Sequence, residues 1–210
     1  DVKSLVSAWA PYYPASNDAA RLRDIARNLG TGACGAATVR VKRGADPQTL
    51  SMDRVPKNTI KKRSTHDRPG ATFQLLNDEV AYIKLSSIRT ADIPSYLASA
   101  RTTRGVIIDI RNYPGQFVPF ALGQHFVREP STFAQFTVGE MSNPGAFRWG
   151  PSATIQPKAP YYPGKVIILV DEMSQSQAEY TAMALRVSPN ARVIGSRTAG
   201  ADGNVSQIPL

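Results

Sequence analysis

The sequence has little cysteine, little histidine and no long hydrophobic run. The single cysteine, Cys34, excludes a disulfide framework and a cysteine-rich metal site. The two histidines, His66 and His125, are too far apart for a short metal-ligand motif, so we do not expect a metalloenzyme. The longest apolar run, residues 166–170, is much shorter than the roughly 20 residues of a membrane-spanning helix. We therefore expect no membrane span.

Positive charge is concentrated towards the amino terminus. Residues 1–70 contain 13 of the 25 Lys and Arg residues but only 6 of the 16 Asp and Glu residues. A nucleic-acid-binding surface would interleave basic and aromatic residues, and the densest basic run, residues 57–63, contains no aromatic residue. We interpret this run as a solvated linker and predict no nucleic-acid partner, while a site for another polyanion stays open.

The chain is long and apolar enough to form one large domain or two small ones, with 210 residues of which 42% are hydrophobic. The apolar spacing of residues 19–29 predicts an amphipathic helix with Asn17 or Asp18 as its cap. Two alternating stretches around a turn at residues 44–47 predict a β-hairpin. The polar and basic residues 57–70, which prolines interrupt, are predicted to form a linker.

Beyond residue 70, apolar and alternating stretches predict strands separated by helices. The predicted strands cover residues 73–78, 79–88, 105–112, 165–172, 191–196 and 204–210. The predicted helices cover residues 93–100, part of 114–130 after a loop, and about 175–187. Residues 131–163, which are rich in Pro, Gly and aromatic residues, are predicted to be irregular. This alternation favours an α/β layered core.

Reactive groups in α/β folds collect where strands end, because the loops there are exposed above a rigid backbone. One predicted strand ends with Arg111 and Asn112 and is followed by a turn in which Gly115 can offer its N–H to a ligand oxygen. Another is followed by Ser174 and Ser176 at the mouth of a helix. A serine in that place is either a helix cap or a nucleophile beside free N–H groups that can stabilise an oxyanion. From the residues alone, capping is the default interpretation.

Four motifs occur in a fixed order along the second part of the chain. They are YIKLSSI (82–88), GVIIDIRNYPG (105–115), GKVIILVDEMSQSQAE (164–179) and VIGSRTAGADG (193–203). With these motifs, residues 71–210 resemble the tail-specific, or carboxyl-terminal processing, serine proteases and their tricorn-like relatives. The resemblance implies a serine endopeptidase with a crotonase-like ββα core, which acts on unfolded or tail-exposed polypeptides and needs no cofactor.

The resemblance also assigns roles to individual residues. It identifies Ser176, three residues before Glu179, as the nucleophile that forms an acyl-enzyme. It assigns the oxyanion hole to the backbone N–H groups of Gly115 and Gln177.

The general base does not follow from these motifs. Members with a Ser–Lys dyad carry their lysine where this chain has Ala201, and serine is a poor nucleophile without a base. Tricorn-like members use a histidine that precedes the PDZ-like module and a glutamate that follows the core. The resemblance thus implies a base from outside these 210 residues. Within the chain, His66 and His125 are the candidate imidazoles, and Asp202 ranks below both because it would need a strongly raised pKa.

The first third resembles the carboxyl-terminal half of the PDZ-like module of these proteases. The predicted organisation is a partial PDZ-like segment (1–56), the linker (57–70) and a protease core (71–210). A chain that begins within a module and ends within a predicted strand is expected to be a fragment, and free strand edges would favour a homo-oligomer. The family and the scarcity of cysteine lead us to expect a periplasmic or extracellular bacterial location.

Several interpretations stay open at this point. The chain is an enzyme core, a catalytically inactive protease-like scaffold that captures peptides, or a polyanion binder that uses its basic first third. Asp109 and Arg111 are interpreted as a brace for the turn that follows them. The aromatic residues of the predicted irregular stretch either line a substrate groove or pack in the core: Phe133, Phe136, Phe147, Trp149, Tyr161 and Tyr162.

Overall fold

The computed structural model describes residues 1–60, 66 and 68–203, and the chain divides into two compact units. The smaller unit comprises Asp1–Pro14 and Arg21–Ser64, and the larger one comprises Ala15–Ala20 and Thr65–Leu210. The division after Ser64 falls inside the predicted linker, most of whose basic run lies outside the described residues. The predicted strand at residues 204–210 also lies outside them. The three-part domain organisation stays a prediction.

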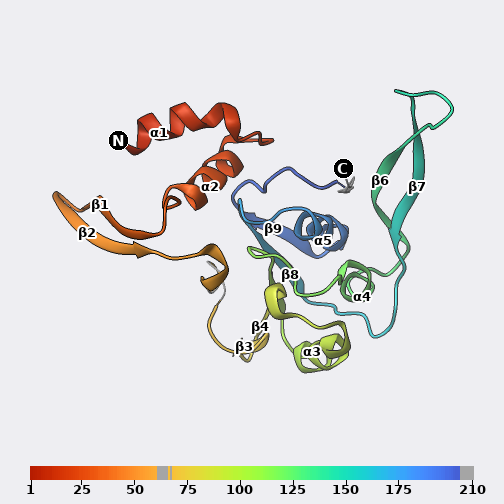
Figure 1. Cartoon of the computed structure of the whole chain (residues 1–210). Helices are drawn as coiled ribbons and strands as arrows, with labels where there is room; N and C mark the ends of the chain where they lie inside the picture. The colour runs from red at the N-terminus through yellow and green to blue at the C-terminus, as the bar shows by residue number, and fades with distance from the viewer. Residues whose placement is uncertain (61–65, 67, 204–210) are drawn as a thin grey trace. The chain divides into compact units, whose positions relative to one another are not determined.

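The smaller unit contains helices and a hairpin. Its elements are α1 (Val2–Trp9), the 3-10 turn η1 (Ala10–Tyr12), most of α2 (Asp18–Asn28), β1 (Gly35–Arg43), β2 (Asp46–Arg54) and the 3-10 turn η2 (Lys57–Thr59) (Figure 1). The Oδ1 atom of Asn17 accepts a hydrogen bond from the Ala20 N–H at 3.0 Å, which confirms the predicted cap of α2. The β1–β2 hairpin is confirmed as well. Its turn is shorter than predicted, because Arg43 already pairs with Asp46.

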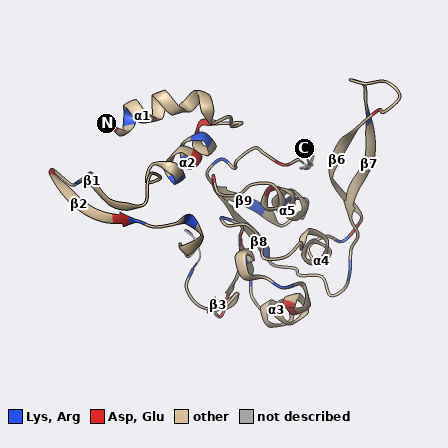
Figure 2. Cartoon of the chain, viewed as in Figure 1, with Lys and Arg blue, Asp and Glu red and all other residues tan. Residues whose placement is uncertain are grey.

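Positive charge is spread over several elements of the smaller unit. Figure 2 shows Lys and Arg on α1, on α2 and at the β1–β2 hairpin. The densest basic run, residues 57–63, is described only as far as Ile60. Its interpretation as a linker, and the polyanion hypothesis, therefore stay predictions.

Within the described residues, the centre of the larger unit is a five-stranded sheet. Its strands lie in the order β3 (Phe73–Asn77), β4 (Val80–Lys84), β5 (Gly105–Asp109), β8 (Lys165–Val170) and β9 (Ala191–Gly195). β3 is antiparallel to β4, and the other neighbouring pairs are parallel. The connections carry the 3-10 turns η3 (Leu85–Ser87) and η4 (Thr90–Asp92) and the helices α3 (Ile93–Ala100), α4 (Pro119–Gly123) and α5 (Gln177–Arg186). The predicted α/β fold is confirmed, and the structure adds that most of its sheet is parallel.

One face of this sheet is buried beneath the helices. Ile83, Ile108 and Ile168 are register partners on adjacent strands and are completely buried. Full burial of such a side chain contributes about 1.5–3 kcal/mol to stability. The same hydrophobic cluster includes one leucine from each helix, namely Leu97, Leu122 and Leu185. This packing fixes the carboxyl ends of β5 and β8, where the candidate site lies.

The prediction that residues 131–163 are irregular was wrong. β6 (Ser131–Gly139) and β7 (Phe147–Ile155) form an antiparallel arm, which Figure 1 shows beside α4 and α5. The register shifts twice along β6, first between Thr132 and Ala134 and then between Gln135 and Thr137. These irregularities interrupt the two-residue alternation by which a strand is recognised in a sequence.

Gly195, at the end of β9, provides a test of the close packing between β9 and β8 in the central sheet. Its φ is +137°, and a Cβ atom there would lie 1.8 Å from the carbonyl oxygen of Val170. We expect Gly195→Ala to lower the free energy of unfolding by more than about 2 kcal/mol, measured by thermal or chemical denaturation. Gly203→Ala is the control, because a Cβ atom at Gly203 meets nothing within 4 Å. Equal stability of the two variants would contradict this account.

Candidate active site

Ser176 occupies the sharp turn between β8 and α5. Its backbone has φ +54° and ψ −120°, and among the described non-glycine residues it alone has a positive φ. Strained backbone of this kind persists only where the surroundings fix it, and it is concentrated at functional sites. A strand-to-helix turn with this strain is also the geometry that exposes the nucleophilic serine in other hydrolases. The half-buried Ser176 is the N-cap of α5 and forms a capping box with Glu179, so the capping interpretation holds; what is unusual for a cap is its positive φ.

The carboxylate of Glu179 fixes the Ser176 turn. Its Oε2 atom accepts hydrogen bonds from the N–H groups of Ser176 at 3.1 Å and Ala201 at 3.0 Å. Its Oε1 atom accepts one from the Gly200 N–H at 2.7 Å. The Ser176 N–H also points at the Ala201 carbonyl oxygen, 2.9 Å away. Glu179 therefore joins the Ser176 turn to the loop after β9, a role that sequence reasoning missed although the Ser-x-x-Glu spacing is a known helix-start signature.

The loop after β9 is also held from the other side by Ser16 and Asn17, which belong to the same unit. The Nδ2 atom of Asn17 donates to the carbonyl oxygens of Thr198 at 2.9 Å and Ala199 at 3.1 Å. The Oγ atom of Ser16 donates to the Gly200 carbonyl oxygen. This loop is consequently fixed on two sides, and Ala201 lies directly against the backbone of Ser176.

The other serine of the motif, Ser174, has a structural role. Its side chain is completely buried, and its Oγ atom donates to the Ile110 carbonyl oxygen at 2.8 Å. The same Oγ atom accepts from the Asp171 N–H at 3.1 Å. Ser174 therefore joins the ends of β5 and β8 and leaves Ser176 as the serine at the turn.

The predicted oxyanion donors differ in their availability. Gln177 is the first residue of α5, so its N–H is one of those that a helix leaves without an internal acceptor. The Gly115 N–H, in contrast, donates to the Leu85 carbonyl oxygen at 2.8 Å. The prediction for Gly115 is corrected, because the loop after β5 packs so tightly on η3 that a Cβ atom at this position would lie 2.9 Å from the Ser86 carbonyl oxygen.

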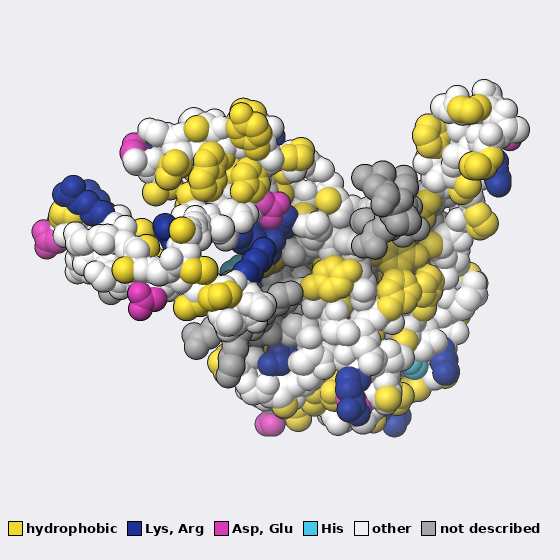
Figure 3. All heavy atoms as spheres, viewed as in Figure 1, with side chains coloured by type: hydrophobic (Ala, Val, Ile, Leu, Met, Phe, Trp, Pro, Cys, Tyr) yellow, Lys and Arg dark blue, Asp and Glu magenta, His cyan; other side chains and the backbone are white. Residues whose placement is uncertain are grey.

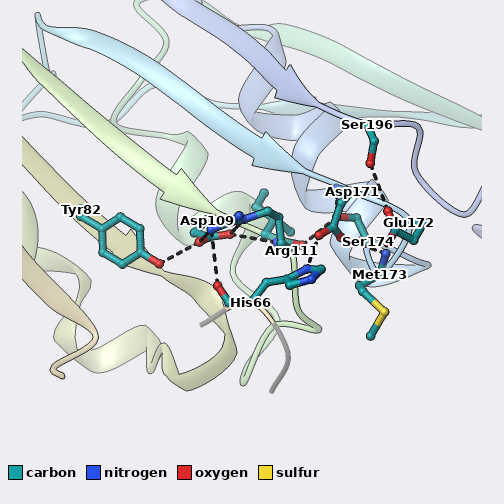
Figure 4. A network of polar contacts seen from close by, with 10 residues as sticks. His66, Tyr82, Asp109, Arg111, Asp171, Glu172, Met173, Ser174 and Ser196 are labelled. Atoms are coloured by element: carbon teal, nitrogen blue, oxygen red, sulfur yellow. Dashed lines mark hydrogen bonds and ion pairs between the residues drawn. The ribbon is translucent and has the colours of Figure 1, made fainter. Parts of the chain in front are cut away.

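Asp109 and Arg111 brace the end of β5, as Figure 4 shows. Arg111 donates to both oxygens of the Asp109 carboxylate, at 2.9 and 2.6 Å, and the Tyr82 hydroxyl donates to it at 2.7 Å. Burial favours a higher pKa for Asp109, but the hydrogen bonds from Arg111 and Tyr82 outweigh it, so the pKa lies below its usual value. Burial and the Asp109 carboxylate raise the pKa of Tyr82. Asp109 and Arg111 thus form an ion pair within the protein, and we interpret it as structural.

Neither described histidine contacts Ser176. The Nδ1 atom of His66 pairs with the Asp171 carboxylate, and its carbonyl oxygen lies 3.4 Å from an Arg111 nitrogen (Figure 4). His125 is 6% exposed, and its ring nitrogens face the Pro160 carbonyl oxygen at 3.0 Å and the Gln124 side chain at 3.4 Å. The candidate base His125 is corrected to a packed core residue. The role of His66 as a base stays a prediction.

Asp202 follows Ala201 in the loop beside Ser176. Its Oδ2 atom is buried and has no hydrogen-bond partner among the residues that the structure describes. Burial, and then the negative charge of Glu179, raise the pKa of Asp202. Burial and the charge of Asp202 in turn raise the pKa of Tyr180.

Over residues 1–60, 66 and 68–203, no three His, Cys, Asp or Glu side chains are grouped so that they could hold a metal ion. No helix in the same part of the chain is long and apolar enough to cross a membrane.

Comparison with known proteins identifies the family. Residues 79–210 match the family model of Peptidase family S41, so the chain belongs to this family of serine-type peptidases. The resemblance to the carboxyl-terminal processing proteases is thereby confirmed. No curated protein matches the sequence.

Solved structures resemble this chain at low identity, and the first two below, whose TM-scores exceed 0.5, show the same fold. A peptidase candidate from Parabacteroides merdae ATCC 43184 is 17% identical, over 93% of this chain and 53% of its own, with a TM-score of 0.53. Mature CPAF complexed with lactacystin is 12% identical, over 99% of this chain and 64% of its own, with a TM-score of 0.70. The photosystem II D1 C-terminal processing protease is 19% identical, over 79% of this chain and 45% of its own, with a TM-score of 0.47. This chain spans between half and two thirds of the length of the first two.

The contacts of the Glu179 carboxylate predict that replacing it loosens the Ser176 turn and the loop after β9. A glutamine at this position has one oxygen acceptor in place of two, so Glu179→Gln leaves at least one N–H of Ser176, Gly200 or Ala201 without its acceptor on this side chain. We expect unfolding to become easier by about 1–3 kcal/mol, with faster hydrogen exchange at those three amides. The exposed Glu129→Gln is the control. Unchanged exchange at all three amides would refute the role of Glu179.

The Asp109 ion pair predicts a dependence of stability on pH. Because the pKa of Asp109 lies below its usual value in the folded protein, the stabilisation is complete above about pH 4 and is lost as the pH falls through the folded pKa. We expect the melting temperature to fall less between pH 5 and pH 3 in Asp109→Asn than in the wild type. Asp78→Asn, at an exposed position, should keep the wild-type slope. Identical slopes for all three proteins would contradict the prediction.

Proposed function

We propose that the protein is a serine endopeptidase that hydrolyses peptide bonds through an acyl-enzyme on Ser176. The observation that carries the proposal is the positive φ of Ser176 at the β8–α5 turn, which Glu179 stabilises. Membership of Peptidase family S41 supports the reaction class. The finer assignment to the tricorn-like type, with a crotonase-like core and a PDZ-like first segment, is part of the same proposal.

The proposed reaction proceeds in two halves. The Ser176 Oγ atom attacks the carbonyl carbon of the scissile bond while a general base accepts its proton. The Gln177 N–H stabilises the negative oxygen of the tetrahedral intermediate, and one such donor accounts for roughly 2.7–4 kcal/mol. The C–N bond breaks as the base returns the proton to the departing amine. Water then attacks the acyl group in the same manner and releases Ser176.

The proposed reaction needs a general base, and ring nitrogens of both histidines face groups other than Ser176. His125 is engaged by Pro160 and Gln124, and His66 is paired with Asp171. Ala201 stands where the lysine of the Ser–Lys type would be. We therefore propose a histidine from outside these 210 residues as the base, with His66 as the alternative within them.

The fact that neither described histidine contacts Ser176 also supports a second candidate function. A protease-like scaffold without chemistry would keep the fold and capture peptides but leave Ser176 unreactive. In either case we propose unfolded or tail-exposed polypeptides as the ligands, a periplasmic or extracellular location, and assembly into a homo-oligomer.

Covalent labelling separates the two candidates. We expect an alkyl fluorophosphonate to modify the natural full-length protein at Ser176, with peptide mapping by mass spectrometry as the readout. Ser176→Ala should abolish the label, and the exposed Ser142→Ala should retain it. A full-length protein that binds peptides but neither takes up the label nor cleaves an unfolded substrate would be the inactive scaffold.

A further inference from the structure

An aromatic cluster lies one helical turn beyond Ser176. The Tyr180 N–H donates to the Ser176 carbonyl oxygen at 2.9 Å, and residues four apart lie on the same side of a helix. The Tyr180 ring contacts four phenylalanine rings from other elements. The centroid distances are 5.8 Å to Phe117, 6.3 Å to Phe120, 5.0 Å to Phe133 and 5.9 Å to Phe136.

Three segments bring these rings to the helix that begins at Ser176. Phe117 lies in the loop after β5, Phe120 in α4, and Phe133 and Phe136 in β6. The Nε2 atom of Gln177 donates to the Gln116 carbonyl oxygen at 2.8 Å, so the loop with Phe117 is tied to the first residue of α5. The position of the cluster relative to Ser176 is therefore fixed by contacts within the larger unit.

Much of this aromatic surface is exposed. Phe117, Phe120 and Phe136 are 55%, 40% and 44% exposed, while Phe133 and Tyr180 are half-buried beneath them. Figure 3 shows hydrophobic side chains gathered on the body of the molecule beside the base of the β6–β7 arm. Single exposed apolar residues are ordinary, but contiguous apolar patches mark binding surfaces. Phe133 is half-buried by this packing, whereas the other three phenylalanine rings contact Tyr180 and still keep a large exposed surface.

A polar group accompanies the rings. The negative charge of Asp202 acts on Tyr180, and the Asp202 Oδ2 atom is buried without a partner among the described residues. Binding sites for organic groups usually combine a mainly apolar wall with a few polar groups that orient the ligand. The surroundings of Ser176 have both components.

We propose that Phe117, Phe120 and Phe136, supported by Tyr180, receive a large apolar side chain of the polypeptide next to the scissile bond. This inference rests on the proposed function and adds the substrate class to it. Flat rings make extensive contact with an aromatic or long aliphatic side chain. A methyl side chain would make few of these contacts, and a charged one would lose hydration against them.

Two serine-directed diphenyl phosphonates test the inference on the full-length protein. One carries a benzyl side chain and the other a methyl side chain at the position next to phosphorus. We expect the benzyl reagent to modify Ser176 at least about tenfold faster. In the double variant Phe117→Ser, Phe136→Ser we expect this ratio to fall below about threefold. Phe147→Ser is the control, because Phe147 is 70% exposed on the arm and should leave the ratio unchanged.

The alkyl fluorophosphonate, which has no such side chain, separates the two levels of the account. It should react at equal rates with the wild type and with Phe147→Ser, which lies outside the proposed side-chain site. If it does not modify Ser176, the proposed function fails. If it does, but the wild type reacts equally fast with both phosphonates, the substrate class is wrong and the function stands. The wild-type ratio needs no substitution, so the inference is decided even if the double variant does not fold.

Discussion

The site depends on one buried carboxylate that accepts three backbone N–H groups. Glu179 is 8% exposed and binds the amides of Ser176, Gly200 and Ala201. Hydrogen bonds to a charged acceptor are about twice as strong as neutral ones, and a negative charge in the first turn of a helix is favoured by the helix dipole. These bonds compensate for the strained backbone of Ser176. The hydrogen bond from the Ser176 N–H to the Ala201 carbonyl oxygen acts in the same direction.

The sheet supplies the rigid frame for this arrangement. β5 and β8 are adjacent parallel strands, so their carboxyl ends meet at one edge of the sheet, where ligands bind in open α/β folds. Ser174 joins the two strand ends through the Ile110 carbonyl oxygen, and the Asp109–Arg111 pair braces the end of β5. The loop after β9 completes the site because Asn17 and Glu179 hold it from two sides. Groups from distant parts of the sequence thus hold the strand ends and loops next to Ser176.

Local patterns in the sequence predicted most of the fold. The helix at residues 93–100 and the apolar strands β5 and β8 follow directly from periodicity and composition. The β6–β7 arm was missed because its register shifts disturb the alternation. For the site, the resemblance carried by the motif order predicted Ser176 as the nucleophile and Gln177 as an oxyanion donor, and both stay predictions. It could not reveal that the Gly115 N–H donates to the Leu85 carbonyl oxygen. Nor could it reveal that Glu179 binds a loop more than twenty residues away, because both contacts depend on tertiary packing.

The central claim is that the fold aims the Ser176 hydroxyl at a point that the Gln177 amide also faces. A crystal structure of the full-length protein after reaction with a serine-directed phosphonate tests it most directly. The account predicts a covalent bond from the Ser176 Oγ atom to phosphorus, with a phosphonyl oxygen at hydrogen-bond distance from the Gln177 N–H. An unmodified Ser176 with an ordinary negative φ, or a phosphonyl oxygen turned away from Gln177, would contradict it.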